Sequence, residues 1–189
     1  MKQIFIIEHL EPRVFKWCWI EYAHISSIVG KGNLWFTNVK RGSKLLRRLG
    51  KVFKESVREM DLNDACVLDP EANKALNPKE ARKCMYFIFG GILGDYPPKR
   101  RTRKELTKFV KDAKAFNIGK KQMSTDNAVF VVREISRGKR LGEMKFVDGL
   151  EIKLNKIESV DMPYRYALHD GRPVFSSKLI DYLKRKKGF

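Results

Sequence analysis

Cysteine and histidine are both scarce in this chain, with three of each among 189 residues. Cys18, Cys66 and Cys84 stand far apart, and none belongs to a CxxC pair. We therefore expect neither a disulfide framework nor a zinc site, and no metal site of another kind. Unpaired cysteines that pack as small apolar residues are typical of proteins from a reducing compartment.

Long apolar runs are also missing. The run at residues 4–7 ends at Glu8, so it is too short for the apolar part of a signal peptide or for a membrane-spanning helix. No later stretch approaches membrane-spanning length. The expectation is a cytoplasmic protein without a membrane partner.

Acidic residues are too few to balance the basic ones. The chain has 40 Lys and Arg against 22 Asp and Glu, which gives a formal net charge of +18. Its 43% hydrophobic content, with many aromatic residues, indicates a folded chain and not a disordered basic tail. Such an excess favours a polyanionic partner, for which RNA is the first hypothesis and an anionic membrane the second.

Three common signatures of nucleotide and ester chemistry are absent. The stretch GGILGD at residues 90–95 lacks the Gly-Lys-Ser/Thr ending of a phosphate-binding loop, and it does not match GxGxxG. The chain also contains no GxSxG sequence. These absences count against P-loop enzymes, conventional dinucleotide-binding enzymes and α/β-hydrolases.

The apolar pattern predicts an α/β protein. Short buried-type runs predict strands at 4–7, 33–39, 65–68, 85–89 and 115–118. Helical spacing predicts helices at 15–29, from 43, at 102–115, at 124–137 and from 177, and residues 145–154 read as a strand or as a hairpin around Asp148-Gly149. This alternation indicates a mostly parallel sheet flanked by helices. We expect one domain over residues 1–145, with residues 146–189 as an extension packed on it.

Three loops follow predicted strands and carry the residues best suited to hold a ligand. They are VLDP at 67–70, the glycine-rich stretch that follows the strand at 85–89, and GKKQMSTD at 119–126. Ligands of parallel α/β sheets bind beyond the carboxyl ends of the strands, and glycines allow close approach of the backbone. We therefore expect these loops to share one binding cleft.

These loops, together with DMPYRY at 161–166, resemble the SFM1-like family of SPOUT methyltransferases. The motifs VLDP, YFIFGGILGDYPP, GKKQMSTDNA and DMPYRY occur in the same order over residues 4 to 166. The resemblance implies a deep C-terminal trefoil knot and S-adenosylmethionine as cofactor. Carried over to this chain, the cofactor-binding residues are Leu68, Asp69, Phe89, Gly90, Gly91, Ile92, Leu93, Gly94, Asp95, Gln122, Met123, Ser124, Thr125 and Asp126.

The acceptor of the methyl group decides which side chains are needed for catalysis. An arginine acceptor needs carboxylates that orient its guanidinium, and Glu8 and Glu21 are the candidates. An RNA base or ribose would more naturally use Asp95, Asp126 or Arg165. Each of these acids also has an ordinary structural interpretation as a helix cap or an ion-pair partner.

The charge favours RNA of the translation machinery as the substrate. One basic cluster follows the central loop and predicts an RNA-binding surface, formed by Lys99, Arg100, Arg101, Arg103, Lys104 and Lys108. A second cluster lies between Lys40 and Arg48. The alternatives are methylation of an arginine in a protein of the small ribosomal subunit, as the resemblance implies, and a non-catalytic RNA-binding protein. RNA or the small subunit is thus the expected partner, and the chain is expected to be a monomer or a homodimer.

Overall fold

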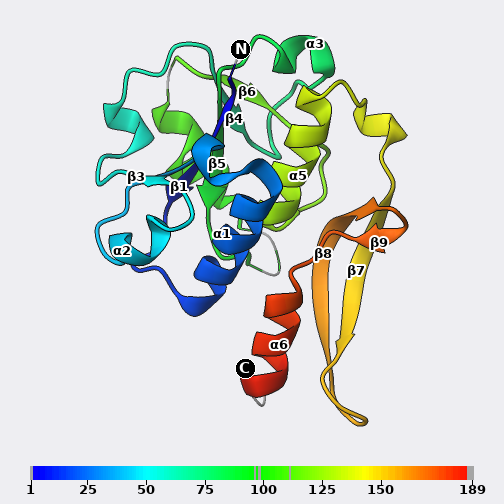
Figure 1. Ribbon diagram of the computed structural model, residues 1–189. Helices are drawn as coiled ribbons and strands as arrows, with labels where there is room; N and C mark the ends of the chain where they lie inside the picture. Colours follow the sequence, from blue (N-terminus) through cyan, green and yellow to red (C-terminus); the bar gives the residue numbers. More distant parts are fainter. Residues whose placement is uncertain (1, 96, 98, 111, 187–189) are drawn as a thin grey trace.

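The computed structural model describes residues 2–95, 97, 99–110 and 112–186, so Tyr96 and Pro98 of the central motif lie outside it. Its main feature is a six-stranded sheet with the strand order β3-β2-β1-β5-β4-β6, in which all neighbouring strands are parallel (Figure 1). The strands are β1 (Ile4–His9), β2 (Leu34–Thr37), β3 (Lys51–Val52), β4 (Ala65–Leu68), β5 (Tyr86–Gly91) and β6 (Lys114–Phe116). The expected mostly parallel α/β sheet is therefore confirmed, and the trefoil knot stays a prediction of the family resemblance.

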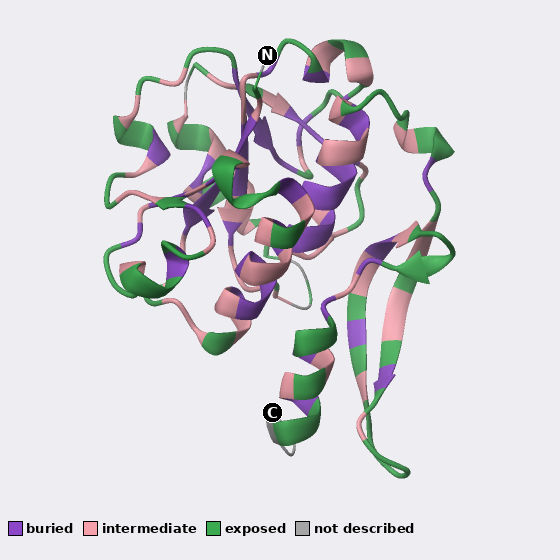
Figure 2. Ribbon diagram, viewed as in Figure 1, coloured by how far each residue is buried: buried purple, intermediate pink, exposed green. Residues whose placement is uncertain are grey.

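One face of this sheet is covered by two long helices, α1 (Lys16–Val29) and α5 (Thr125–Ser136), which also pack on each other (Figure 1). Alternation along the central strand β1 explains the two layers. Phe5 and Ile7 point into the core shared with the helices, whereas Ile4 and Ile6 point to the other face. Because both faces are covered, every residue of β1 is buried (Figure 2).

The other face is covered by short segments. They are the 3-10 helix η2 (Val57–Glu59), the helix α4 (Arg101–Glu105) and the 3-10 helix η3 (Thr107–Phe109). Val57 and Leu106 are the buried residues that these segments add to the core on this side. The remaining short helices are η1 (Lys31–Asn33), α2 (Ser43–Leu46), α3 (Pro78–Ala81) and η4 (Leu141–Glu143).

A second, antiparallel sheet begins at Phe146, the residue at which the sequence analysis placed the start of an extension. It consists of β7 (Phe146–Lys153), β8 (Ser159–His169) and β9 (Arg172–Pro173), and it is followed by α6 (Ser177–Lys186). A separate apolar cluster, which includes Tyr166, Leu179 and Leu183, joins this sheet and α6 to Ile20 of α1. α6 thereby packs against α1 (Figure 1).

Two predicted elements differ from the structure. The helix expected at 102–115 ends at Glu105, because Leu106 turns into the core with φ −128° and ψ −68° and Arg58 donates a hydrogen bond to the carbonyl oxygen of Glu105. The turn of the antiparallel hairpin does not lie at Asp148-Gly149. Gly149, with φ +78°, instead forms a bulge inside β7, and the hairpin turns at residues 154–158.

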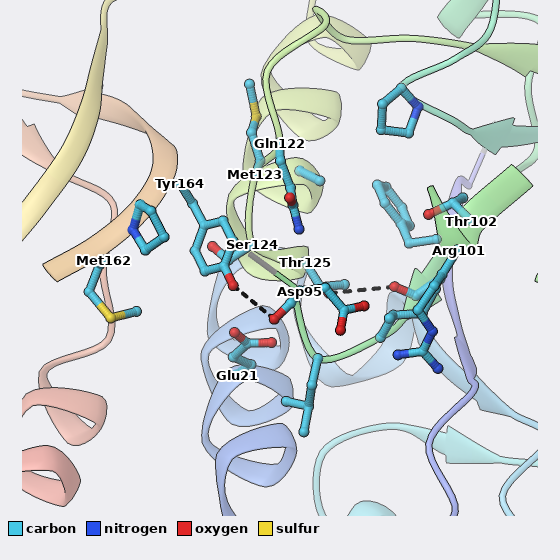
Figure 3. A pocket seen from close by; sticks show the side chains of 18 of the residues that line it. Glu21, Asp95, Arg101, Thr102, Gln122, Met123, Ser124, Thr125, Met162 and Tyr164 are labelled. Atoms are coloured by element: carbon cyan, nitrogen blue, oxygen red, sulfur yellow. Dashed lines mark hydrogen bonds between the residues drawn. The ribbon is translucent and has the colours of Figure 1, made fainter. Parts of the chain in front are cut away.

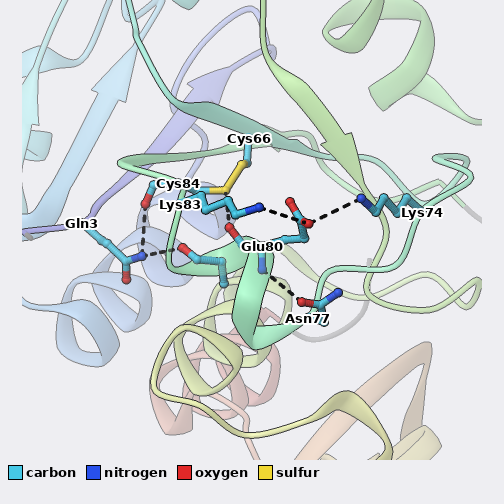
Figure 4. Close-up of a disulfide and its surroundings, with 8 residues drawn as sticks. Gln3, Cys66, Lys74, Asn77, Glu80, Lys83 and Cys84 are labelled. Carbon is cyan, nitrogen blue, oxygen red and sulfur yellow. Dashed lines mark hydrogen bonds and ion pairs between the residues drawn. A yellow bond between two sulfur atoms is a disulfide. The ribbon is translucent and has the colours of Figure 1, made fainter.

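The expectation of unpaired cysteines is wrong for two of the three. Cys66 of β4 and Cys84, just before β5, form a disulfide (Figure 4), and Cys18 is free and buried. The two residues are 18 positions apart in sequence, but the pairing of β4 with β5 brings their Cα atoms to 6.0 Å. No cysteine motif in the sequence predicts this disulfide, because the two cysteines meet only through the order of the strands in the sheet. Among the described helices, none has the length and apolar character needed to cross a membrane.

Candidate active site

A large cavity of about 1150 Å³ opens at the carboxyl ends of the parallel strands. The loops that follow β4 and β5 form one wall, and the segment Gly119–Ser124 before α5 forms another. The remaining walls come from the start of α1, from β8 and from α6. The three loops that the sequence analysis placed in one cleft therefore meet here.

The predicted cofactor-binding residues all line this cavity except Gly91 and Asp126. Gly91 lies under the loop, where a Cβ atom would come within 2.5 Å of Tyr22 Oη. Asp126 lies behind the cavity wall, where its carboxylate accepts a hydrogen bond from Ser124 Oγ at 2.6 Å and pairs with His24 Nδ1 at 2.7 Å. Both residues therefore support neighbours that line the cavity.

The central loop that follows β5 is hydrogen-bonded to Glu11, a residue that was not among the predicted site residues. Glu11 Oε1 accepts hydrogen bonds from the backbone N–H of Leu93 at 3.0 Å and from Arg101 Nη1 at 2.9 Å. Tyr164 Oη of β8 donates to the carbonyl oxygen of Gly94 at 2.9 Å. These contacts join residues 70 to 90 positions apart, so no local sequence signal could have shown them.

The cavity fits S-adenosylmethionine, the cofactor that the resemblance implies. Phe89, Ile92, Leu93 and Met123 give it apolar walls beside backbone groups of the three loops. Gln122 Oε1 is a buried acceptor that has no hydrogen-bond partner among the described residues. An amphipathic ligand with an amino group would satisfy this acceptor. No cluster of three or more His, Cys, Asp or Glu suited to a metal ion occurs in the described part of the chain.

Among the predicted catalytic carboxylates, Glu21 is the one that is shielded from bulk solvent and also lines this cavity (Figure 3). It lies on α1 one turn after Trp17, whose Nε1 donates a hydrogen bond to Glu21 Oε1 at 3.0 Å. Burial raises the pKa of Glu21 to about 8, and the nearby charge of Asp126 acts in the same direction. The carboxyl therefore favours a cationic group that enters the cavity and replaces the lost solvation.

The other predicted catalytic residues are placed differently. Glu8 is fully buried away from the cavity, where it accepts hydrogen bonds from Thr37 Oγ1, Ser56 Oγ and the backbone N–H of Val57. Asp95 lines the cavity and pairs with Lys99 at 2.9 Å. Arg165 does not line it, because its guanidinium pairs with Asp148 at 2.7 Å.

The basic cluster after the central loop is mostly neutralised by acids, which differs from the free RNA-binding surface expected. Arg100 pairs with Glu71 at 3.2 Å and Arg103 with Asp69 at 3.0 Å, and Lys99 pairs with Asp95. A further pair joins Arg101 to Glu105 at 2.7 Å. Only Lys104 and Lys108 of the six are exposed without an ion pair to any described residue. The four paired residues also line the cavity, so this part of the cluster belongs to its wall.

Arg103→Ala tests this structural role. Asp69 is only 1% exposed, so loss of Arg103 leaves its carboxylate buried with a weaker set of partners. We expect the free energy of unfolding to fall by about 2 kcal/mol in urea titrations. Arg100→Ala is the matched control, because the Arg100 side chain is 72% exposed and its pair should contribute little. Equal stability of the two variants would contradict the assignment.

Three comparisons with known proteins agree with this geometry. The family described as protein arginine N-methyltransferase SFM1-like matches residues 4–188. Protein arginine N-methyltransferase SFM1 of Saccharomyces cerevisiae is 33% identical over 200 residues, which cover 96% of this chain and 94% of the yeast protein. The crystal structure of the yeast arginine methyltransferase SFM1 complexed with SAM is similar with a TM-score of 0.88 and 32% identity, over 98% of this chain and 92% of the yeast chain.

A more distant neighbour shares the fold alone. The dual-specific Trm10 protein from Thermococcus kodakaraensis superposes with a TM-score of 0.58 at 17% identity, over 75% of this chain and 96% of the other. It matches a smaller part of the chain than the yeast structure does.

Proposed function

Because the chain belongs to the SFM1-like family of protein arginine N-methyltransferases, and is therefore an S-adenosylmethionine-dependent methyltransferase, we propose that its methyl acceptor is the guanidinium group of a protein arginine. The observation that carries this proposal is the buried carboxyl of Glu21 at the wall of the cavity. A guanidinium is a planar cation with several N–H donors, and a carboxylate is the side chain that binds it best. The arginine acceptor thus takes the place of RNA as the main hypothesis.

The cofactor is proposed to occupy the part of the cavity formed by the three strand-end loops. Leu68, Asp69 and residues 89–90, 92–95 and 122–125 would hold it, with Gln122 Oε1 as an acceptor for an amino group. S-adenosylmethionine supplies a methyl group on a positively charged sulfur, which needs no metal to make it reactive. The task left to the protein is to align the acceptor nitrogen and to bind its charge.

Glu21 is proposed to perform that task from the opposite wall. Its Oε1 atom is fixed by Trp17 Nε1, which limits the directions from which a guanidinium can bind. Tyr164 and Asp95 come from β8 and the central loop to the same part of the cavity (Figure 3). The guanidinium, once bound between them, keeps the Glu21 carboxyl ionised despite its burial.

The acceptor class can be tested with labelled S-adenosylmethionine. An extract from cells that lack the enzyme is incubated with the protein and the labelled cofactor, and samples are then digested with ribonuclease or with protease. We expect the label to resist ribonuclease and to be released by protease. Label released by ribonuclease would overturn the arginine proposal in favour of an RNA acceptor.

A further inference from the structure

Most of the basic charge of this chain has no role in binding an arginine, which is itself a cation. The cluster beside the cavity is largely neutralised by acidic partners, as described above. The net charge of +18 must therefore act elsewhere on the surface.

The strongest concentration of unbalanced charge lies between residues 38 and 54. This stretch contains seven basic residues and no acidic one, and all seven are exposed. None of them forms an ion pair with any residue that the structure describes. We call these residues the basic surface: Lys40, Arg41, Lys44, Arg47, Arg48, Lys51 and Lys54.

The basic surface adjoins the mouth of the cavity. It covers α2 and continues to the edge strand β3, and α2 lies beside the loop that leads into α1 (Figure 1). Gly42 is packed so closely against Val14 that a Cβ atom at Gly42 would lie 3.3 Å from Val14 Cγ2. The next residues along the chain, Phe15 and Lys16, already line the cavity.

Aromatic rings accompany the charges at the β3 end of this surface. Lys51 Nζ lies over the rings of Trp35 and Phe53, at 5.2 and 4.7 Å from their centroids, and both rings are half-buried. In RNA recognition, basic side chains usually bind the phosphates, and partly exposed aromatic rings beside them stack on unpaired bases. A membrane would require a broad apolar face instead, and Leu45 is the one large apolar side chain of residues 38–54 that is exposed, at 53%.

We propose that the basic surface binds the phosphate backbone of RNA, so that the enzyme docks on RNA next to the protein segment that it methylates. RNA binding itself stands on the charge and exposure of residues 40–54. That the methyl acceptor is a protein segment beside this RNA rests on the proposed function. It also explains how a strongly basic enzyme approaches a cationic side chain, since RNA would screen the repulsion between them.

The test compares two double charge reversals that change the net charge equally. Arg47→Glu with Arg48→Glu alters the basic surface, and Lys79→Glu with Arg82→Glu alters α3, which lies at the other end of the molecule (Figure 1). All four side chains are exposed, so both variants should fold, and their thermal melting verifies this. The probe is a short fluorescein-labelled RNA hairpin, and binding is followed by fluorescence anisotropy at several salt concentrations without any methyl acceptor.

We expect Arg47→Glu/Arg48→Glu to weaken RNA binding at least about tenfold and to reduce the slope of log K against log salt by about two. The α3 variant should bind nearly as the unmodified protein does. Equal weakening by both variants would overturn the proposal, because it would indicate that RNA responds to the net charge of the whole protein and not to the basic surface. Failure of the unmodified protein to bind the hairpin, or tighter binding to vesicles that contain phosphatidylserine, would overturn it as well. These results do not depend on whether arginine is the acceptor, because the assay measures binding alone.

Discussion

Glu21→Gln is expected to lower kcat/KM for the arginine acceptor by about 100-fold or more, while the affinity for S-adenosylmethionine changes little. The amide has the shape of the carboxyl but cannot carry the charge that binds a guanidinium. The cofactor is proposed to contact the strand-end loops and not α1, so its binding should survive. Steady-state kinetics with the protein acceptor and calorimetric titration of the cofactor measure the two quantities separately.

The matched control for this variant is Asp161→Asn. Asp161 also lines the cavity, but it is exposed, so its charge is largely screened by water. Its activity should stay within a few-fold of the unmodified enzyme. An active Glu21→Gln enzyme would remove Glu21 from the proposed mechanism, and equal losses in both variants would point to a general effect of cavity charge.

The raised pKa of Glu21 adds a pH signature to the same variant. Below about pH 8 the free enzyme binds a proton at Glu21, and this proton competes with the guanidinium, so KM for the acceptor should rise as the pH falls. Stability changes in the opposite sense. Because the folded-state pKa lies above the ordinary value of 4.5, the folded protein keeps a proton at Glu21 that the unfolded chain releases, so stability falls as the pH rises from about 4.5 to about 8. Glu21→Gln should remove both effects, so that its gain in stability is largest above pH 8.

Gly91→Ala is expected to lower the free energy of unfolding by about 3 kcal/mol and to weaken cofactor binding at least about tenfold. The new methyl group would lie 2.5 Å from Tyr22 Oη and 2.8 Å from Ile7 Cγ2, and both of these side chains are buried. Neither can move freely, because Tyr22 Oη is hydrogen-bonded to His9 Nδ1 at 2.8 Å and Ile7 lies in the central strand. The end of β5 must therefore shift, and the loop that follows it shifts with it.

Gly142→Ala is the control for that prediction. Gly142 lies in η4, and a Cβ atom there would have no neighbour within 4 Å. Its unfolding curve in urea and its cofactor titration should match those of the unmodified protein. A Gly91→Ala protein with unchanged stability and affinity would show that the end of β5 does not fix the central loop.

The parallel sheet could be predicted from sequence because its strands are buried on both faces. Continuous apolar runs such as Ile4–Ile7 have few other interpretations when glycine-rich loops follow them. The helix at 102–115 was predicted wrongly because the position of Leu106 is determined by the core beneath it and by Arg58, which is 47 residues from Glu105. The disulfide between Cys66 and Cys84 was missed for a similar reason, since it follows from the pairing of β4 with β5.

The candidate site was predictable to the extent that its residues share local motifs. The loops after β4 and β5 carry their own signatures, whereas Glu11 supports the central loop across 82 residues and carries none. The basic residues of the sequence were the least reliable basis for predicting a binding surface. Sequence composition cannot distinguish Arg103, which pairs with the buried Asp69, from Arg47 and Arg48, which have no ion pair to a described residue. The RNA hypothesis was therefore attached to a cluster whose main contacts are internal.

The chemical identity of the methylated group tests the central claim most directly. The labelled protein from the extract assay is hydrolysed to amino acids, and the products are separated by chromatography, with Glu21→Gln enzyme in a parallel reaction. We predict that the label elutes with methylated arginine and is nearly absent from the Glu21→Gln sample. Label in methylated lysine, histidine or a nucleoside would contradict the account.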